Sequence, residues 1–174
     1  MQEHRALHQM RCPLPVEAAA IPTRDYADTD FEELRSVNNR AFSSHPDQGN
    51  RSAEALRATM TEPWFRADGV RIHEEDGRIA GFCWTKIHPS PPAAVELGEI
   101  YVIGVDPDYH GRGLGVPMTA AGLEWLADQG ISTGMLYVEA DNIPALRTYE
   151  RLGFTILRTD RAWTWAAPPE GSAP

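Results

Sequence analysis

Residues 104–115 read Gly-Val-Asp-Pro-Asp-Tyr-His-Gly-Arg-Gly-Leu-Gly, a glycine-rich loop of the kind that can hold phosphate. The preceding residues 99–105 are β-branched and aromatic, which predicts a strand, and the residues after the loop have the apolar spacing of a helix. Gly111, Gly113 and Gly115 let the backbone approach a ligand closely. Their N–H groups, together with the positive end of the helix dipole, can bind a pyrophosphate.

The glycine spacing alone leaves a second interpretation open, a tight strand-to-helix turn without a ligand. Two other phosphate-binding motifs do not fit. A P-loop needs Lys and then Ser or Thr after its last glycine, where this chain has Val116 and Pro117. The dinucleotide fingerprint needs three glycines at a different spacing, followed by an acidic ligand for the ribose.

The composition bounds the class of protein. A chain of 174 residues with 42% hydrophobic content is long enough for one well-filled core and short for two, so we expect one domain. Sixteen Lys and Arg against twenty-five Asp and Glu give a net charge of −9, which disfavours nonspecific binding to nucleic acid. This acidity is compatible with a cationic or amine substrate, and equally with a surface that is acidic for solubility.

The two cysteines, Cys12 and Cys83, are far apart in the sequence, and Cys83 lies in the apolar run 79–85. This placement favours buried thiols over a disulfide or metal ligands and is compatible with a reducing compartment. No apolar stretch approaches the roughly 18 residues of a spanning helix. The N-terminus also lacks the apolar core of a signal peptide. We therefore expect a cytoplasmic protein that does not associate with a membrane.

The chain is expected to alternate strands and helices in one domain. Thr29 and Glu32 form a capping-box pattern before the first helix, and Asp76-Gly77 is the turn of a β-hairpin. We divide the chain into an N-terminal strand and connector (1–22), a domain (23–166) and a flexible tail (167–174). The predicted elements are a strand at 6–11, helices at 29–42 and 52–61, a hairpin of 70–75 with 78–87, a strand at 95–105, a helix ending near 129, a strand at 135–138, a helix at 143–152 and a strand at 155–165.

A second motif lies downstream of the glycine loop, Asn142-x-x-Ala145-x-x-x-Tyr149-x-x-x-Gly153-Phe154. With the order of elements, the two motifs resemble the GNAT superfamily of acyl-CoA-dependent N-acetyltransferases. In that family the loop usually begins with Gln or Arg, where this chain has His110. The resemblance implies an α/β fold in which helices flank a mixed, centrally splayed sheet, with acetyl-CoA lying in the splay.

Within that superfamily the chain is similar to the C-terminal half of the mycothiol synthases over roughly residues 31–165. Those enzymes normally carry two tandem GNAT-like halves, and this chain has room for one. It is therefore expected to be the second half on its own or a single-domain relative with another amine substrate. The matching segments are 37–42, 45–49, 81–86, 98–107 and 136–142.

The chemistry of acetyl transfer needs two groups besides the donor site. An amine attacks a thioester only in its neutral form, so a base must take its proton and an acid must protonate the departing thiolate. The resemblance makes Glu99 the base and Tyr149 the acid. By the strand period of two, Glu99 shares a face with Tyr101, Ile103 and Val105 unless a bulge intervenes. It lies roughly 13 Å along the strand from Ile103, which favours proton transfer through a water.

The resemblance also implies two binding sites. Backbone groups of the strand before the glycine loop would bind the pantetheine arm as an added strand does, and an amide near Gly104 would polarise the thioester carbonyl. The acceptor residues, which would hold the amine of a cysteinyl-glucosaminyl-inositol, are Asp47, Lys86, Glu99 and Tyr137. The acetyl-CoA residues are Ile103, Gly104, Val105, His110, Gly111, Arg112, Gly113, Leu114, Gly115, Val116, Asn142, Ile143, Pro144, Ala145, Leu146 and Arg147.

Each of these side chains also has a structural interpretation. Glu99 could pair with a neighbouring Lys or Arg, Tyr149 could be an amphipathic core tyrosine, and Tyr137 could be a core residue. Asp47 fits a turn and Lys86 the solvated end of a strand.

The alternatives for function are a GNAT enzyme for another small amine or a peptide N-terminus, and a noncatalytic acyl-CoA-binding half of a two-domain enzyme.

No metal site is expected, because His45, His73 and His88 have no metal-ligand spacing. The partners we expect are acetyl-CoA and a small-molecule amine, and not nucleic acid. Whether the chain is a monomer or a homodimer is left open.

Overall fold

The computed structural model describes residues 2–44, 49–90 and 94–164. The chain order there is β1 (Gln2–Pro13), β2 (Arg24–Asp25), α1 (Phe31–Ala41), α2 (Ala53–Met60), β3 (Val70–Glu75), β4 (Arg78–His88), β5 (Leu97–Val105), α3 (Gly115–Asp128), β6 (Thr133–Glu139), α4 (Ile143–Arg151) and β7 (Thr155–Thr164). Three short 3-10 turns join these elements in the described ranges, at Asp28–Asp30, Ala67–Gly69 and Pro107–Tyr109.

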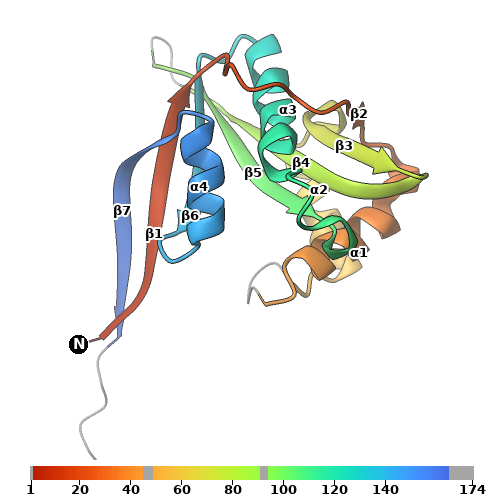
Figure 1. Cartoon of the computed structure of the whole chain (residues 1–174), viewed down its shortest axis with the longest axis horizontal. Coiled ribbons are helices and arrows are strands. Elements are labelled where there is room, and N and C mark those ends of the chain that lie inside the picture. Colours follow the sequence, from red (N-terminus) through yellow and green to blue (C-terminus); the bar gives the residue numbers. More distant parts are fainter. Residues whose placement is uncertain (1, 45–48, 91–93, 165–174) are drawn as a thin grey trace, which may run out of the picture.

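One seven-stranded sheet has the order β2-β3-β4-β5-β6-β1-β7, and all neighbours are antiparallel except β5 and β6. The parallel pairing is confined to Leu97, Gly98 and Glu99 opposite 133–135. Beyond Glu99 the two strands separate (Figure 1). The predicted α/β fold, with a mixed and splayed central sheet flanked by helices, is confirmed.

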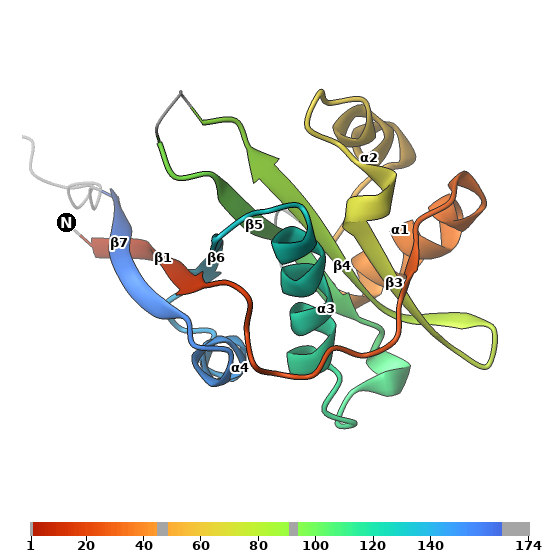
Figure 2. The ribbon, with the colours of Figure 1, turned by 90° about the horizontal axis from the view of Figure 1, so that it is seen from above.

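Two hydrophobic cores lie on opposite faces of the sheet. Helices α3 and α4 cover one face, and α1 and α2 cover the other over the strands β3, β4 and β5 (Figure 2). The α3 face includes Cys83, Ile100 and Leu123, whereas Phe82 and Trp84, which flank Cys83 on β4, point to the α1 face. This alternation follows from the period of two in a strand whose faces are both buried.

Most of the predicted elements are confirmed, and two details differ. The hairpin turns at Asp76 and Gly77, whose φ values are +52° and +72°. The first strand is longer than expected because it pairs along both edges, with β6 and with β7. The capping box of Thr29 and Glu32 is wrong, since the carboxylate of Asp30 accepts the N–H of Ala27 instead. The expected tail, 167–174, lies outside the described residues.

A bulge in β5 changes which side chains share a face. Trp84 pairs with Val102 and the next residue of β4 pairs with Ile100, so Tyr101 is an extra residue in the strand. Tyr101 and Val102 therefore both contact the α1-face core, whereas Ile103 contacts the α3-face core. The expectation that the side chain of Glu99 lies on one face with Ile103 and Val105 is wrong, because a bulge reverses the alternation.

At Gly122, helix α3 packs tightly against the sheet, and a substitution at this position tests the packing. A Cβ at this position would lie 2.4 Å from Sγ of Cys83 and 3.0 Å from Cδ1 of Ile100. We expect Gly122→Ala to lower the free energy of unfolding in urea by roughly 1–2 kcal/mol, because overpacking outweighs the gain in helix propensity.

The exposed Glu124 of the same helix supplies the control, and Glu124→Ala should stay within about 0.5 kcal/mol of the parent protein. In a Cys83→Ala background the Gly122→Ala penalty should shrink, because the nearest atom has been removed. An equal penalty in both backgrounds would show that Sγ is not the obstacle.

Candidate active site

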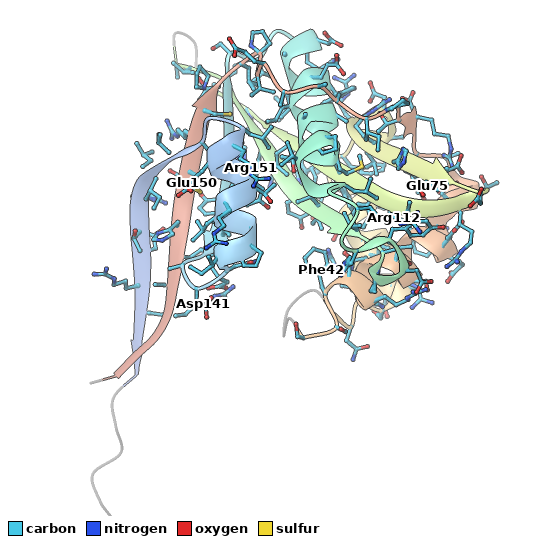
Figure 3. The ribbon with its side chains drawn as sticks, in the orientation of Figure 1. Phe42, Glu75, Arg112, Asp141, Glu150 and Arg151 are labelled. Carbon is cyan, nitrogen blue, oxygen red and sulfur yellow. The ribbon has the colours of Figure 1, made fainter. Side chains whose placement is uncertain are left out.

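A groove occupies the region where β5 and β6 separate. Its volume is about 260 Å³, and both strands, β1 and the beginning of α4 contribute to its walls. Figure 3 shows Phe42, from the end of α1, on one side of this opening and Asp141, before α4, on the other. The lining residues are Arg5, Leu7, Phe42, Tyr101, Val102, Ile103, Tyr137, Val138, Glu139 and Asn142. Of the predicted residues the groove thus brings together Ile103, Asn142 and Tyr137.

The glycine loop leads from β5 into the N-terminus of α3. Gly111 and Gly113 have φ values of +77° and +73°, a region that glycine adopts without strain. The first turn of α3 has neither a side-chain cap nor an acidic residue. Its N–H groups can therefore bind an external anion, as the glycine pattern predicts.

Two side chains of the loop have partners within the protein. The His110 ring donates from Nε2 to the carbonyl oxygen of Val105 at 2.9 Å. Arg112 donates to Glu75 at 2.7 Å and lies over the ring of Tyr109, with its guanidinium carbon 4.9 Å from the ring centre (Figure 3). The positive charge of Arg112 is thus balanced by Glu75, so the backbone N–H groups of the loop carry most of its attraction for an anion.

Helix α4 contributes the second predicted motif. Asn142 is its N-cap, and the side-chain oxygen accepts the N–H of Ala145 at 3.3 Å. Ala145 and Leu146 pack on the α3-face core, whereas Ile143, Pro144 and Arg147 are exposed. A Cβ at Gly115 would lie 3.7 Å from Thr148, so α4 abuts the beginning of α3. The two motifs, far apart in sequence, meet beside the groove.

Tyr149 is buried on the inner face of α4. Its ring packs edge-to-face on Phe154 at a centroid distance of 5.8 Å, and both belong to the α3-face core. Burial raises the pKa of the Tyr149 phenol above its ordinary value. The core interpretation of this residue is therefore correct, and the same burial keeps the phenol protonated, which is the form that a general acid needs.

Glu99 is buried at the point where the sheet opens. Its Oε2 lies 2.6 Å from Nε2 of His88, and its side chain is 10% exposed. In the described ranges no Lys or Arg forms an ion pair with this carboxylate, so the alternative of a Lys or Arg partner is replaced by pairing with histidine. The sequence pattern around His88 has no metal-ligand spacing and does not indicate this pairing with Glu99. One feature of the sequence does point to His88: it lies two residues beyond Lys86, so the two side chains share one face of the strand.

Lys86 lies against aromatic rings instead of at a solvated strand end. Its Nζ is 4.5 Å from the centre of the Trp64 ring and 5.8 Å from that of Tyr101. The Trp64 and Tyr101 rings contact each other at 4.9 Å. Cation–π attraction orients the ammonium group in this arrangement. Trp64, on the segment after α2, is a site residue that the sequence analysis missed.

The other two predicted acceptor residues differ in outcome. Tyr137 is 40% exposed, so its interpretation as a core residue is wrong. Its hydroxyl accepts a hydrogen bond from Nε2 of Gln9 at 2.8 Å, which fixes the phenol at the groove wall. Asp47 lies outside the described residues.

Neither a metal cluster nor a membrane-spanning helix occurs in the described part of the chain. No group of three or more His, Cys, Asp and Glu side chains there could hold a metal ion. None of the described helices is both long enough and apolar enough to cross a membrane.

Comparison with known proteins defines the class to which this fold and site belong. A model of the acetyltransferase (GNAT) family matches residues 31–154. This match covers more than half of the chain, and the chain therefore belongs to the GNAT acetyltransferase family. Members of this family use acetyl-CoA as co-substrate.

Among curated proteins, the chain is similar to enzymes named mycothiol acetyltransferase. It is 44% identical to that of Acidimicrobium ferrooxidans over 173 residues, covering 94% of this chain and 55% of the relative. Identity to the Mycobacterium avium enzyme is 46% over 185 residues, covering 95% of this chain and 57% of the relative. The chain thus spans about half the length of these curated relatives.

Solved structures show the same fold at lower identity. A GCN5-related N-acetyltransferase from Sphaerobacter thermophilus matches with a TM-score of 0.72 and 19% identity, covering 91% of this chain and 50% of that one. The ribosomal-protein-S18-alanine N-acetyltransferase of Escherichia coli matches with a TM-score of 0.60 and 24% identity, covering 76% of each chain. These likenesses concern the fold.

The burial of Tyr149 predicts a specific loss of stability in alkali. Tyrosine in the unfolded chain titrates at about pH 10, and the folded-state pKa is raised, so the stabilisation is complete below that pH and is lost as the pH rises above it. We expect the free energy of unfolding in urea to fall less steeply above about pH 10 in Tyr149→Phe than in the parent protein. Parallel curves for the two proteins would contradict the burial of the ionisable hydroxyl.

Proposed function

We propose that this chain transfers the acetyl group of acetyl-CoA to the primary amine of a cysteinyl-glucosaminyl-inositol, by direct attack within a ternary complex. The observation that carries the proposal is the separation of β5 from β6 immediately after Glu99, next to the uncapped N-terminus of α3. This arrangement offers a place for an acyl donor and puts a buried carboxylate at its edge.

The donor site fits acetyl-CoA in its chemistry. The N–H groups at the loop and at the start of α3 would hold the pyrophosphate. The edge of β5 that leaves β6 would bind the pantetheine arm as an added strand, with Ile103 at the groove wall. Because the Val105 carbonyl already accepts from His110, we assign the pantetheine contact to the backbone of Ile103. An amide near Gly104 would polarise the thioester carbonyl.

The reaction needs one base and one acid, and the chain supplies both. Glu99 would take a proton from the acceptor ammonium through a water, which leaves a neutral amine. The amine nitrogen then bonds to the thioester carbon, the carbon–sulfur bond breaks, and the Tyr149 phenol protonates the departing thiolate. The nitrogen loses its second proton as the amide forms, which restores the phenol, and Glu99 releases the proton that it took to solvent. The products are the N-acetylated amine and CoA, with one proton released for each turnover.

The acceptor would lie on the sheet face shared by Lys86, Glu99 and Tyr137. Lys86 and the Tyr137 hydroxyl are hydrogen-bonding groups suited to a polyhydroxylated ring, and the exposed parts of Trp64 and Tyr101 provide apolar surface for its C–H faces. We retain Asp47 as a proposed contact with the acceptor. A peptide acetyltransferase would have no shared need for these groups.

The noncatalytic alternative is not favoured, because the chain has both Glu99 and Tyr149 in environments that suit proton transfer. Glu99 has a hydrogen-bonding partner in His88, and Tyr149 is kept protonated by burial. A half that served only to bind acyl-CoA would need neither group.

The test is CoA release measured with acetyl-CoA and a panel of amines containing the cysteinyl-glucosaminyl-inositol, small amines and peptide N-termini. We expect turnover with the first, and we expect Glu99→Gln and Tyr149→Phe each to lower kcat/KM by on the order of 10²-fold. The matched control is Glu124→Gln, an exposed position on α3.

Two outcomes would contradict the proposal. Full activity of both variants would remove Glu99 and Tyr149 from the reaction, and absence of turnover with every amine would favour the noncatalytic half. For the acceptor itself, Lys86→Ala should raise KM for the pseudodisaccharide amine more than for a small amine.

The glycine loop provides a separate test of the donor site. Gly113 has φ +73°, and no atom lies within 4 Å of the place that a Cβ would take. The Gly113→Ala substitution therefore strains the backbone and places a methyl group where a ligand would approach, without a clash inside the protein. We expect KM for acetyl-CoA to rise about tenfold, since the strain of a left-handed alanine is roughly 1–2 kcal/mol.

Gly77→Ala is the control for this substitution, because Gly77 has φ +72°, equally open space and a place in the β3–β4 turn. It should lower stability to a similar extent and leave KM for acetyl-CoA unchanged. An equal rise of KM in both variants would assign the effect to stability instead of to the donor site.

A further inference from the structure

We propose that His88 is a positioning residue for the reaction: its Nε2–H fixes one oxygen of the Glu99 carboxylate and leaves the other oxygen to take the proton of the acceptor amine. This inference rests on the proposed function. It adds a group that neither the loop motif nor the acceptor residues include.

The geometry of two strands brings the pair together. Lys86 and His88 lie on one face of β4, and the register pairs Lys86 with Glu99 and His88 with Leu97. The His88 ring thus reaches Glu99 diagonally across the antiparallel pair, with 2.6 Å between Nε2 and Oε2. Diagonal neighbours in such a pair are within reach of long side chains. A bond of this length to a carboxylate belongs to the strong, charge-assisted class.

The two partners differ in their contact with solvent. The Glu99 side chain is 10% exposed and that of His88 is 33% exposed. A carboxylate oxygen so far out of water is costly without a hydrogen-bond donor, and the His88 N–H supplies one to Oε2. In the described ranges no side chain donates to Oε1 of Glu99, so this oxygen is left for a water or the acceptor.

Other charged groups on this face do not replace His88. From β4, Lys86 is held over the rings of Trp64 and Tyr101 and forms no ion pair with Glu99 in the described ranges. From β6, the register partner of Glu99 is Met135, which does not titrate, and from β1 the residue opposite Met135 is Arg11. On the same face of the sheet, the phenol of Tyr101 lies beside Lys86.

Removal of the donor has a consequence that can be measured. The carboxylate would lose its only side-chain partner in the described ranges and would no longer be held in the orientation that serves the acceptor amine. The groups that bind the acceptor would be unchanged, so kcat should fall while KM stays close to that of the parent protein.

The experiment compares His88→Ala with His88→Gln, using the full chain, acetyl-CoA and the amine that the proposed function identifies. A glutamine amide places an N–H donor near the position of Nε2, whereas alanine has none. We expect His88→Ala to lower kcat about tenfold with little change in KM, because the base is no longer held in place. His88→Gln should restore most of kcat.

His73→Gln is the matched control. His73 is also a strand histidine beside a glutamate, with Nε2 3.5 Å from Glu75, but it lies on β3 away from the groove. Its variant should keep the kcat and KM of the parent protein. Circular dichroism and urea unfolding of each variant would check that the fold is retained.

The outcomes separate the two proposals. An unchanged kcat in His88→Ala would overturn the role of His88, and so would a loss of kcat that glutamine does not restore. If Glu99→Gln is as active as the parent protein, the proposed function fails at the base itself. If His88→Ala keeps the parent activity while Glu99→Gln is inactive, only the inference about His88 is overturned.

Discussion

The constraint on which the site depends is the short parallel pairing of β5 with β6. Three residues of each strand face one another, and beyond Glu99 the strands separate. Parallel neighbours require a crossover, and here α3 supplies it, which places the glycine loop at the end of β5 and α4 directly after β6. A strand edge that loses its neighbour has unpaired backbone groups, and these need partners. The groove lies where the strands separate, and the buried Glu99 carboxylate lies at the same point. The crossover places the uncapped N-terminus of α3, which can bind an anion, beside them.

The bulge at Tyr101 adds a second constraint. Glu99 lies before the bulge and Ile103 after it, and the extra residue turns Ile103 to the α3 face while Tyr101 stays on the α1 face. Donor and acceptor contacts can therefore be made from opposite faces of one strand. The aromatic contacts of Tyr101 with Trp64 and Trp84 hold the bulged residue in place.

The sequence predicts those features of the fold that are determined by interactions between residues close together in the chain. The hairpin at Asp76-Gly77, the glycine loop and the helix that begins at Ile143 have signals within a few residues, and the structure has each of them. The bulge, by contrast, is set by aromatic packing between β4, β5 and the segment after α2, so the strand period alone gives the wrong face for Ile103. The pairing of Arg112 with Glu75 joins residues far apart in the chain, and no local pattern encodes it.

The partner of Glu99 illustrates the same limit, because two residues eleven apart become neighbours only when the β4–β5 register is known. That register gives Glu99 an N–H donor from His88. Tyr149, in contrast, is surrounded by apolar side chains, and burial raises the pKa of its phenol. In this chain the two environments lie on opposite sides of the sheet: the helix face of α3 and α4 provides the apolar one, and the strand face of β4 provides the donor.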